Sequence, residues 1–549
     1  MEKDKELLRD SCHICGSNRI HYRFITNGSP ICQCEDCDFM FVNPQPSIEK
    51  LAEIYKAGYF LGANSSGGEK TVSEMKGQTA EMYLSHLLDY SGVKRGKLIE
   101  IGCGNGDFLA LAKEKGFEVK GIEISKDAAK TANNRIGEEC VVCGTLENTD
   151  LPAGYFDICV LFDVIEHVYD PVGFLRKIHD LLKPDGVIFI VTPSLDSWSA
   201  RLMRSNWVEF KTEHLHYFNT QTIQNVLAKT GFNKIDIAPN YKYLTLEYIK
   251  DHFQKFRIPF FTDLVSFFMV LVPGNFRRRR IKIVASGMNV LARKSRLNSR
   301  ETVSIIVPVY NEKSTFPELI GALTAKELHG LHKEIIIVES NSTDGTREEV
   351  LKYKDTPGIK LIFEEKPLGK GHAVRAGLGS ATGEFVMIQD GDLEYDLNDY
   401  DELLEPLLKY RKAFVLGSRH SKGWKMRHFA DQPLISLIMN FGQIFFATLL
   451  NIFCRQKLKD PFTMYKVFRK DCIYGLTFKA NRFDFDWEIV IKLLRKGYRP
   501  LEIPVNYNSR SFKEGKKVSF FKDPLLWFWA LIRFRFGRLY EKNKNEAAK

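Results

Sequence analysis

The sequence predicts two α/β domains, each built on a largely parallel β-sheet, behind a small cysteine-rich module. Apolar, β-branched runs that end in glycine-rich or acidic turns occur around residues 97–123 and again around residues 303–390. Such runs are typical of buried parallel strands that end at a ligand-binding edge. The length of 549 residues also exceeds one ordinary core, and domain-size priors suggest about three to four folding units.

These patterns divide the chain into four expected segments. They are a cysteine-rich module at 1–48, a first α/β domain at 49–250, an apolar and basic linker at 251–300, and a second α/β domain at 301–549.

The composition is that of a folded chain, with 44% hydrophobic and 27% charged residues. The net charge of +11 is too diffuse to indicate a nucleic-acid partner, and the cluster "FRRRRIK" beside apolar residues suits an anionic membrane surface better. The first residues, "MEKDKELLRD", are charged and lack the apolar core of a signal peptide. We therefore expect a cytoplasmic location, with the 11 cysteines as reduced thiols or metal ligands.

Four cysteines near the start have the spacing of a structural zinc site. Cys12 and Cys15 in "CHIC" precede Cys34 and Cys37 in "CEDC", in the pattern C-x2-C-x18-C-x2-C. Two such knuckles turn four thiolates onto one tetrahedral ion, so we expect Zn²⁺ there. Cys32 and His13 are spare candidates.

The segment "KLIEIGCGNGDFLALAKEKGFEVKGIEIS" reads as a strand, a glycine-rich turn, a helix and a second strand. Gly102 and Gly104 allow a ligand to approach the backbone closely at the helix start. Glu123 ends the second strand, where an acid accepts hydrogen bonds from a ribose. A dinucleotide fingerprint would need its third glycine later than Gly106.

The continuation, "FDICVLFDVIEHVYDPVGFLRKIHDLLKPDGVIFIVTP", adds a buried strand, an acidic turn, a helix and another strand. Over about 80–235 the chain resembles the class I S-adenosylmethionine-dependent methyltransferases, which are Rossmann-like. The resemblance implies S-adenosylmethionine as cofactor. It places Glu100, Gly102 and Gly104 around the methionine part, Glu123 on the ribose and Asp163 in the pocket wall.

The cysteine-rich module together with the later motif "EHLHYF" resembles methyltransferases that act on nucleotide-linked sugars. That resemblance implies acid/base work for Glu213 and His214. A neutral imidazole oriented by a carboxylate can take a proton from a hydroxyl or an activated carbon. The alternative is that His214, His216 and Tyr217 only cap and pack a strand.

The expected linker contains an apolar run from Phe260 to Val272, interrupted by Asp263. This run is shorter than the roughly twenty residues that a membrane-spanning helix needs. We expect an interfacial helix anchored by the arginines that follow it. A helical linker packed between the two domains is the alternative.

In the second domain, three strand-like runs end in polar residues: "VSIIVPVYNE", "EIIIVESNSTDGT" and "EFVMIQDGDLEYD". This pattern predicts a parallel sheet whose carboxyl edge binds a ligand. Asp390 and Asp392 are two residues apart, so at a strand end they share a face. Both can reach one hard cation, Mg²⁺ or Mn²⁺.

From 302 to about 517 the chain resembles the family 2 inverting glycosyltransferases of GT-A fold, most closely the polyprenyl-phosphate (dolichyl-phosphate) mannose or glucose synthases. The resemblance implies a nucleotide-sugar donor, with cations that offset charge on the leaving diphosphate. It places donor and phosphate contacts on Pro308, Tyr310, Glu312, Ile337, Glu339, Asp390, Gly391, Asp392, Glu394, Arg419, Arg510 and Lys516. Where the family usually has paired aspartates after the second strand, this chain has Glu339 and Ser340, which leaves the donor base open.

A later acidic group, Asp484, Asp486 and Glu488, resembles a late acidic motif of the same family. An alcohol acceptor would need one of them, with Asp486 as the candidate, as general base. A lipid phosphate is already an anion and needs none. The alternative is that the group only pairs with Arg419 or Arg510.

The run "LISLIMNFGQIFFATLLNIF", 434–453, is long enough to span a membrane. Polar residues recur in it at helical spacing, at Ser436, Asn440, Gln443 and Asn451. A crossing would also separate active-site residues on its two sides. We therefore expect an amphipathic helix or hairpin at the bilayer surface, presenting the lipid acceptor; a buried core helix is the alternative.

Together these patterns predict a bifunctional enzyme at the cytoplasmic face of a membrane. One half transfers a sugar to a polyprenyl phosphate or lipid-linked glycan, and the other methylates a sugar or related intermediate. One alternative is a polysaccharide glycosyltransferase with a hydroxyl acceptor and a methyl-capping domain. Another is a methyltransferase half that binds its cofactor only as a scaffold.

Overall fold

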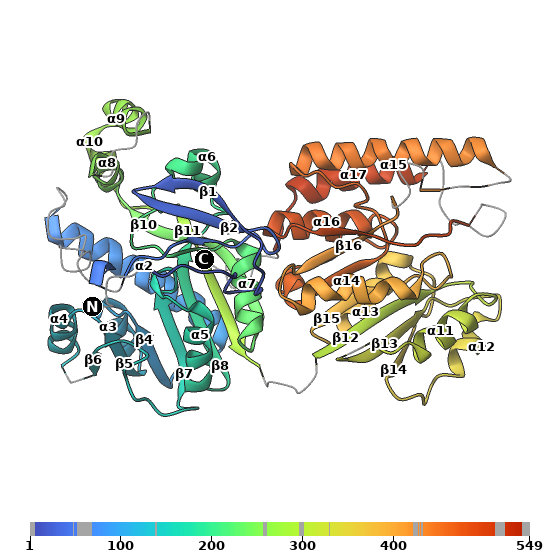
Figure 1. Ribbon diagram of the computed structural model, residues 1–549, viewed down its shortest axis with the longest axis horizontal. Helices are drawn as coiled ribbons and strands as arrows, with labels where there is room; N and C mark the ends of the chain where they lie inside the picture. Colours follow the sequence, from blue (N-terminus) through green and yellow to red (C-terminus); the bar gives the residue numbers. More distant parts are fainter. Residues whose placement is uncertain are drawn as a thin grey trace. The chain divides into compact units, whose positions relative to one another are not determined.

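The computed structural model divides into two compact units, Met1–Leu297 and Asn298–Lys549 (Figure 1). The described residues are 6–47, 49–51, 68–137, 140–255, 261–295, 301–328, 330–420, 426–427, 429, 432–510 and 522–540.

The cysteine-rich module is a small antiparallel sheet at the start of the first unit. Strands β1 (Ile20–Thr26), β2 (Ser29–Cys34) and β3 (Met40–Val42) follow one another, and β9 (His216–Tyr217) adds a fourth strand beside β3. Because β9 comes from the motif "EHLHYF", the module shares a sheet with the rest of the first unit.

The first unit is centred on a seven-stranded sheet of order β10-β11-β8-β7-β4-β5-β6. Strands β4 to β8 run parallel, and β11 is antiparallel to both of its neighbours. The bounds are β4 (Lys97–Ile101), β5 (Glu118–Glu123), β6 (Val141–Cys143), β7 (Phe156–Phe162), β8 (Leu182–Pro193), β10 (Phe232–Leu244) and β11 (Ile281–Lys294). The central strands are almost wholly buried, as parallel strands covered on both faces must be.

The expected linker at 251–300 is not a linker. Its second half is β11, which lies between β8 and β10 inside the sheet. Its first half is a helical excursion between β10 and β11, made of α8 (Leu246–Lys255), α9 (Phe261–Leu271) and α10 (Gly274–Arg277) (Figure 1). The strand was missed because its alternating sequence follows an apolar and basic stretch that resembles a surface segment.

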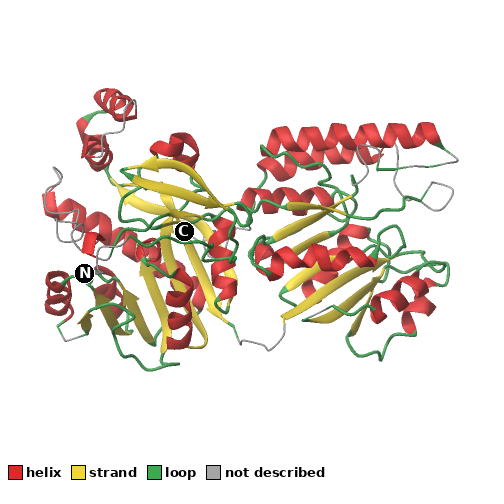
Figure 2. Ribbon diagram, in the orientation of Figure 1, coloured by secondary structure: helices red, strands yellow, loops and turns green. Residues whose placement is uncertain are grey.

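Helices flank this sheet, as Figure 2 shows. Helix α4 illustrates how local sequence sets their ends: the Ser125 side chain accepts a hydrogen bond from the Ala128 N–H, and Gly137 ends the helix at φ 84°. The other helices of this unit are α2 (Gly68–Ser91), α3 (Asp107–Glu114), α4 (Lys126–Ile136), η1 (Ile165–His167), α5 (Pro171–Leu181), α6 (Trp198–Met203), η2 (Arg204–Asn206) and α7 (Thr220–Lys229).

The second unit is a seven-stranded sheet of order β14-β13-β12-β15-β17-β16-β18, in which β17 runs antiparallel to β15 and β16. Its carboxyl edge is formed by neighbouring strands β13, β12 and β15, the three runs expected from sequence. The bounds are β12 (Glu301–Val309), β13 (Leu331–Glu339), β14 (Ile359–Phe363), β15 (Phe385–Ile388), β16 (Phe414–Ser418), β17 (Lys466–Arg469) and β18 (Leu501–Pro504).

Helices surround this second sheet and bury its apolar core. The two longest, α15 and α17, lie side by side along one edge of the unit (Figure 1). The bounds are α11 (Phe316–Ala325), α12 (Thr346–Leu351), α13 (Lys370–Ser380), η3 (Leu397–Asp399), α14 (Tyr400–Leu408), α15 (Pro433–Cys454), η4 (Lys470–Ile473), α16 (Phe485–Lys496) and α17 (Lys522–Phe536).

Candidate functional site

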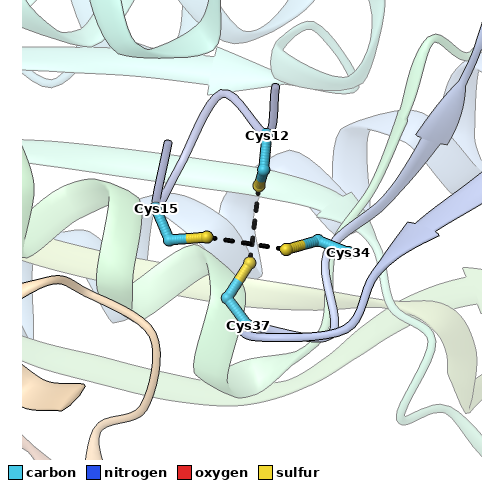
Figure 3. A group of neighbouring side chains, drawn as sticks. All are labelled: Cys12, Cys15, Cys34 and Cys37. Carbon is cyan, nitrogen blue, oxygen red and sulfur yellow. Dashed lines mark hydrogen bonds between the residues drawn. The ribbon is translucent and has the colours of Figure 1, made fainter. Parts of the chain in front are cut away.

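The four cysteines of the module converge on one point (Figure 3). The Sγ atoms of Cys12 and Cys37 are 3.5 Å apart, as are those of Cys15 and Cys34, and all four lie within 4.8 Å of one another. Four thiolates at about 2.3 Å from a tetrahedral Zn²⁺ stand about 3.8 Å apart, so the group fits that ion with small shifts.

A pocket of about 340 Å³ lies at the carboxyl edge of the first sheet. The glycine-rich turn after β4 and the acidic turn after β7 form its walls, as expected where neighbouring parallel strands end together. Four of the residues expected to bind a cofactor line it, namely Glu100, Gly102, Gly104 and Asp163.

The glycine turn has positive φ angles, which residues with a side chain adopt only with backbone strain. Gly102 has a φ of 74°, and a Cβ there would meet Val164 Cγ2 at 2.6 Å. Gly104 has a φ of 52° and donates its N–H to the Glu123 carboxylate at 2.7 Å. Glu123 also accepts from the Ser125 N–H at 2.9 Å. Glu123 therefore braces the turn from behind instead of lining the pocket.

Glu100 is the buried acid of this pocket. Burial raises the pKa of its carboxyl well above the usual range, and Asp107 and Glu123 raise it further. Its Oε2 atom is buried and has no hydrogen-bond partner among the residues that the structure describes. An acid held in this state favours a cationic or hydrogen-bond-donating ligand group beside it.

Lys242 is a pocket residue that sequence reasoning missed. Its Nζ lies 3.5 Å from Asp163 Oδ2, and this carboxylate raises the pKa of the lysine. Tyr83 of α2 lines the same pocket, and its hydroxyl donates to Asn240 Oδ1 at 2.6 Å. Neither residue stands in a recognisable motif: Lys242 lies on β10, far from the glycine turn in sequence, and Tyr83 lies on the helix that precedes β4.

The expected partner of His214 differs in the structure. Its Nδ1–H donates to the backbone carbonyl of Glu209 at 2.8 Å, not to the carboxylate of Glu213. Burial holds the pKa of His214 well below its usual range, so the ring is neutral. His214 does stand beside acids, but in a group with Glu166 and His167, whose ligand atoms all lie within 4.8 Å of its own.

The neighbouring residues of "EHLHYF" are structural. His216 and Tyr217 are buried in β9, where they pair with Phe41 and Met40 of the cysteine-rich module. His216 stacks on Phe39 at 5.5 Å between ring centroids. The packing alternative weighed from the sequence therefore holds for these two residues.

The second unit has a larger cavity of about 760 Å³. Nine of the residues expected from sequence line it: Pro308, Tyr310, Glu312, Asp390, Gly391, Asp392, Glu394, Arg419 and Arg510, and the proposed base Asp486 joins them. Two do not. The side chain of Ile337 is fully buried in the core, and Glu339 is buried against the Ser342 N–H at 2.6 Å, so that Ser340 lines the cavity in its place. Lys516 lies outside the described residues.

Each of the two aspartates after β15 forms an ion pair with a basic side chain. Asp390 pairs with Lys370 at the start of α13, and Asp392 pairs with Arg510. Arg510 also donates to both carboxylate oxygens of Glu312, at 3.0 and 3.2 Å. Lys370 was missed, although it stands in "GKGHAVRAG", directly before the strand that carries the aspartates.

The charge state of Asp392 reflects this crowding. Burial, with Asp390 and Glu394 nearby, raises the pKa of Asp392 to about 7. Glu394 accepts hydrogen bonds from the Tyr507 hydroxyl at 2.8 Å and from the Arg510 backbone N–H at 2.7 Å. It therefore holds the chain segment that places Arg510 at the cavity.

Family models match both units. The methyltransferase domain model matches residues 75–237, and the glycosyl transferase family 2 model matches residues 304–488. The chain joins a methyltransferase domain to a family 2 glycosyltransferase domain. The expected fold class, a Rossmann-like domain followed by a GT-A domain, is thereby confirmed.

Curated relatives match the glycosyltransferase domain. A dolichol-phosphate mannosyltransferase of Pyrococcus furiosus is 28% identical over 214 residues, which are 39% of this chain and 58% of the relative. A dolichyl-phosphate beta-glucosyltransferase of Trichomonas vaginalis is 30% identical over 219 residues, which are 38% of this chain and 65% of the relative. The chain thus spans less than two thirds of the length of these two relatives.

Solved structures resemble the methyltransferase domain. A SAM-dependent methyltransferase from Archaeoglobus fulgidus is 19% identical with a TM-score of 0.27, over 39% of this chain and 94% of its own. Phosphoethanolamine N-methyltransferase 2 of Haemonchus contortus is 19% identical with a TM-score of 0.28, over 45% of this chain and 57% of its own.

In the glycosyltransferase domain, the late acids do not hold Arg419 or Arg510. Asp486 accepts from the Lys466 Nζ at 2.8 Å. Glu488 pairs with Lys492 at 2.6 Å and lies outside the cavity lining. The alternative that these two acids pair with Arg419 or Arg510 is therefore wrong.

Helix α15 of this domain turns its polar stripe inward. Asn440 exchanges hydrogen bonds with the Arg427 backbone at 2.9 and 3.0 Å, and Gln443 donates to Asp460 at 3.1 Å. Its outer face carries exposed apolar side chains; Phe441 and Phe445 are each 58% exposed. By length and composition alone, α15 is the one described helix able to cross a membrane. Its hydrogen bonds tie it along its length to the domain.

Proposed function

We propose that this protein transfers a sugar from a nucleotide-sugar to a polyprenyl phosphate at the cytoplasmic face of a membrane, and that its methyltransferase domain methylates a sugar or related intermediate of the same cell-surface glycan pathway. The glycosyltransferase reaction inverts the donor carbon: an oxygen of the acceptor forms the new bond to this carbon as the bond to the nucleoside diphosphate breaks.

One observation carries the glycosyltransferase half of the proposal. The lining of the cavity of about 760 Å³ combines carboxylates and basic side chains with apolar side chains of α15 and α17. The apolar ones are Ile438 and Phe446 of α15 and Trp527 of α17. This arrangement suits a charged diphosphate and an apolar lipid chain that meet in one site.

The apolar faces of α15 and α17 support docking on a bilayer surface. Beside the exposed phenylalanines of α15, α17 exposes Leu525 and Trp529, and its last turn is basic. In the methyltransferase domain, α9 exposes Phe267 and Val270 ahead of the arginines 277–280. Apolar side chains next to basic ones are the composition of interfacial helices.

A hydroxyl acceptor would need Asp486 as general base, and we favour a phosphate acceptor instead. One oxygen of the Asp486 carboxylate, Oδ1, accepts from the buried Lys466 at 2.8 Å, so Asp486 serves as the counter-charge of this lysine. A lipid phosphate needs no base. The related proteins from Pyrococcus furiosus and Trichomonas vaginalis carry dolichol-phosphate and dolichyl-phosphate in their names.

Asp390 and Asp392 would hold Mg²⁺ or Mn²⁺ together with the donor diphosphate. Two adjacent carboxylates are a hard oxygen donor set of the kind these ions prefer. The ion neutralises charge on the diphosphate when bound. Lys370 and Arg510, which pair with these carboxylates, would then turn to the phosphate oxygens and stabilise the leaving group.

In the methyltransferase domain, S-adenosylmethionine would occupy the pocket of about 340 Å³. Glu100 would meet its methionine part, the glycine turn at Gly102 and Gly104 would contact it through the backbone, and Asp163 would face it from β7. Glu213, with His214 beside it, would take the proton that the acceptor loses. The cysteine-rich module would hold a structural Zn²⁺.

Product analysis tests the proposal. Purified protein is offered a panel of nucleotide-sugars with polyprenyl phosphate and Mg²⁺, with and without S-adenosylmethionine, and products are identified by mass spectrometry. We expect a polyprenyl-phosphate sugar in the presence of one donor, and a product in which one methyl group replaces a hydrogen when S-adenosylmethionine and the correct intermediate are present. Sugar transfer only to a glycan hydroxyl would overturn the lipid-phosphate assignment.

A further inference from the structure

A group of two histidines and one glutamate lies in the methyltransferase domain, apart from the four cysteines. Glu166 and His167 stand in η1, directly after β7, and His214 stands just before β9. One ligand atom from each of the three residues lies within 4.8 Å of the other two.

Both imidazoles are held by hydrogen bonds that fix their tautomer. His167 Nδ1 lies 2.9 Å from the backbone oxygen of Glu213, and His214 Nδ1 lies 2.8 Å from that of Glu209. A carbonyl oxygen only accepts, so each Nδ1 carries the hydrogen and Nε2 is the nitrogen with the lone pair. Metal-binding histidines are commonly oriented by a hydrogen bond of this kind.

Glu166 supplies an independent sign that a ligand belongs here. Glu166 is only 1% exposed, and its Oε2 accepts a hydrogen bond from the Thr192 hydroxyl at 3.0 Å. Its Oε1 is buried and has no hydrogen-bond partner among the described residues. A buried carboxylate oxygen left without a partner costs free energy, and a bound cation removes that cost.

We propose that Glu166, His167 and His214 bind a divalent cation. Three atoms within 4.8 Å of one another lie at most about 2.8 Å from a common point, so each needs to shift by about 0.7 Å or less to reach the roughly 2.1 Å of a metal–ligand bond. Two imidazoles and one carboxylate leave further coordination positions open for water or for an oxygen of a substrate.

The position of this site gives the cation a role in methyl transfer. Asp163 and Val191 line the cofactor pocket. Asp163 directly follows β7 and stands three residues before Glu166, and Val191 precedes Thr192 near the end of the neighbouring strand β8. Glu166 and His167 stand close in sequence to this pocket wall, but none of the three ligands lines the pocket. From there the cation fixes the turn after β7 that carries Asp163, a role that rests on the proposed function.

The two metal centres of this domain differ in chemistry, which allows them to be measured separately. Four thiolates select Zn²⁺, whereas a nitrogen and oxygen donor set also accepts Mn²⁺. Mn²⁺ is therefore the probe. The full chain is used with one Zn²⁺ per chain, held by the four cysteines, and with Asp390→Ala and Asp392→Ala in place, so that neither zinc nor the glycosyltransferase domain competes with Mn²⁺.

Mn²⁺ binding to this protein is measured by the loss of the free-ion signal in electron paramagnetic resonance. We expect one saturable Mn²⁺ per chain. Glu166→Gln and His214→Asn should each weaken binding at least about tenfold, while His86→Asn, a half-buried histidine of α2 outside the group, leaves it unchanged. No saturable Mn²⁺, or equal affinity in Glu166→Gln, would overturn the site.

Two further measurements keep the test decisive. Binding of S-adenosylhomocysteine by calorimetry shows whether each variant is folded. In the protein with His167 and His214 intact, pulsed measurements on bound Mn²⁺ should detect imidazole nitrogen, and a spectrum without nitrogen coupling would reject the proposal even where a variant fails to fold. Neither readout needs methyl transfer, so an inactive methyltransferase domain leaves the cation result interpretable.

Discussion

The guanidinium group of Arg419 donates to both carboxylate oxygens of Asp460, over two bonds of 2.7 Å each. Both residues are buried, and the Arg419 backbone N–H also donates to Asp460, at 3.0 Å. Gln443 of α15 donates to the same carboxylate at 3.1 Å. One aspartate thus ties the end of β16, the cavity and the helix with the exposed apolar face into one network.

Asp460→Asn should destabilise the glycosyltransferase domain by about 3–5 kcal/mol, because it leaves a buried guanidinium without its counter-charge. Thermal unfolding followed by circular dichroism measures the loss. The double variant Arg419→Met/Asp460→Leu removes both charges and should recover most of the stability without recovering sugar transfer. An unchanged melting temperature in Asp460→Asn would contradict a structural role for this pair.

Asp390→Ala combined with Asp392→Ala should abolish metal-dependent sugar transfer, because the cation and the diphosphate lose their carboxylates. Binding of S-adenosylmethionine should persist, as the two sites lie in separate domains. Radiolabel transfer and calorimetry measure the two properties in the same preparation. Loss of both would show that the sites are not independent; Lys409→Ala, on the exposed end of α14, is the matched surface control.

Gly104→Asp should block cofactor binding, because it brings bulk and a negative charge into the turn that Glu123 already braces at 2.7 Å. The control is Gly154→Asp, which also replaces a glycine at positive φ, 61°, but has open space around it. Calorimetry with S-adenosylmethionine should show no heat of binding for the first variant and normal affinity for the second. Normal binding by Gly104→Asp would place the cofactor elsewhere.

Phe441→Glu with Phe445→Glu should weaken binding to anionic vesicles at least about tenfold, since burial of each phenylalanine contributes about 1.5–3 kcal/mol. Leu351→Glu changes a lone exposed leucine of α12 and should have no effect. Co-sedimentation with vesicles measures the partitioning. Equal sedimentation of the double variant and the wild type would remove α15 from the docking surface.

Binding of the cation at Asp390 and Asp392 should weaken as pH falls below about 7. The pKa of Asp392 is raised to about 7, by burial first and then by Asp390 and Glu394. Only the ionised carboxylate binds the cation, so protons compete below this pKa, and affinity should fall by up to about tenfold for each pH unit. Mn²⁺ titrations of the Glu166→Gln variant at several pH values measure the slope, and a flat profile from pH 5 to 8 would contradict it.

The functional residues at the ends of strands were predictable because the signal for them is local in the sequence. An apolar run followed by a polar turn carries both the strand and its ligand-binding end, and Glu100, Asp163 and Asp390 were found in this way. Contacts made across the fold left no such signal. Lys242 lies on β10, and the carboxylate beside His214 belongs to Glu166, 48 positions earlier in the chain.

Two expectations failed for physical reasons that the sequence does not display. Ile337 lies two residues before the end of β13 and is fully buried, as are its neighbours Ile336 and Val338, because this strand is covered on both faces. The strand within 251–300 is not recognisable from the sequence, because an apolar helix and a run of arginines directly precede it and together resemble a surface linker. Periodicity cannot tell that a late strand inserts between two earlier ones.

Strand β11 also sets the order of events on the ribosome. The methyltransferase sheet lacks an inner strand until Lys294 has been synthesised, so β8, which ends at Pro193, and β10, which ends at Leu244, are made well before the strand that pairs with both. The glycosyltransferase sheet starts at Glu301, only a few residues later. The nascent chain therefore completes one domain at almost the moment it begins the next, and a gene cut after codon 250 would yield a product with two open strand edges that is prone to aggregate.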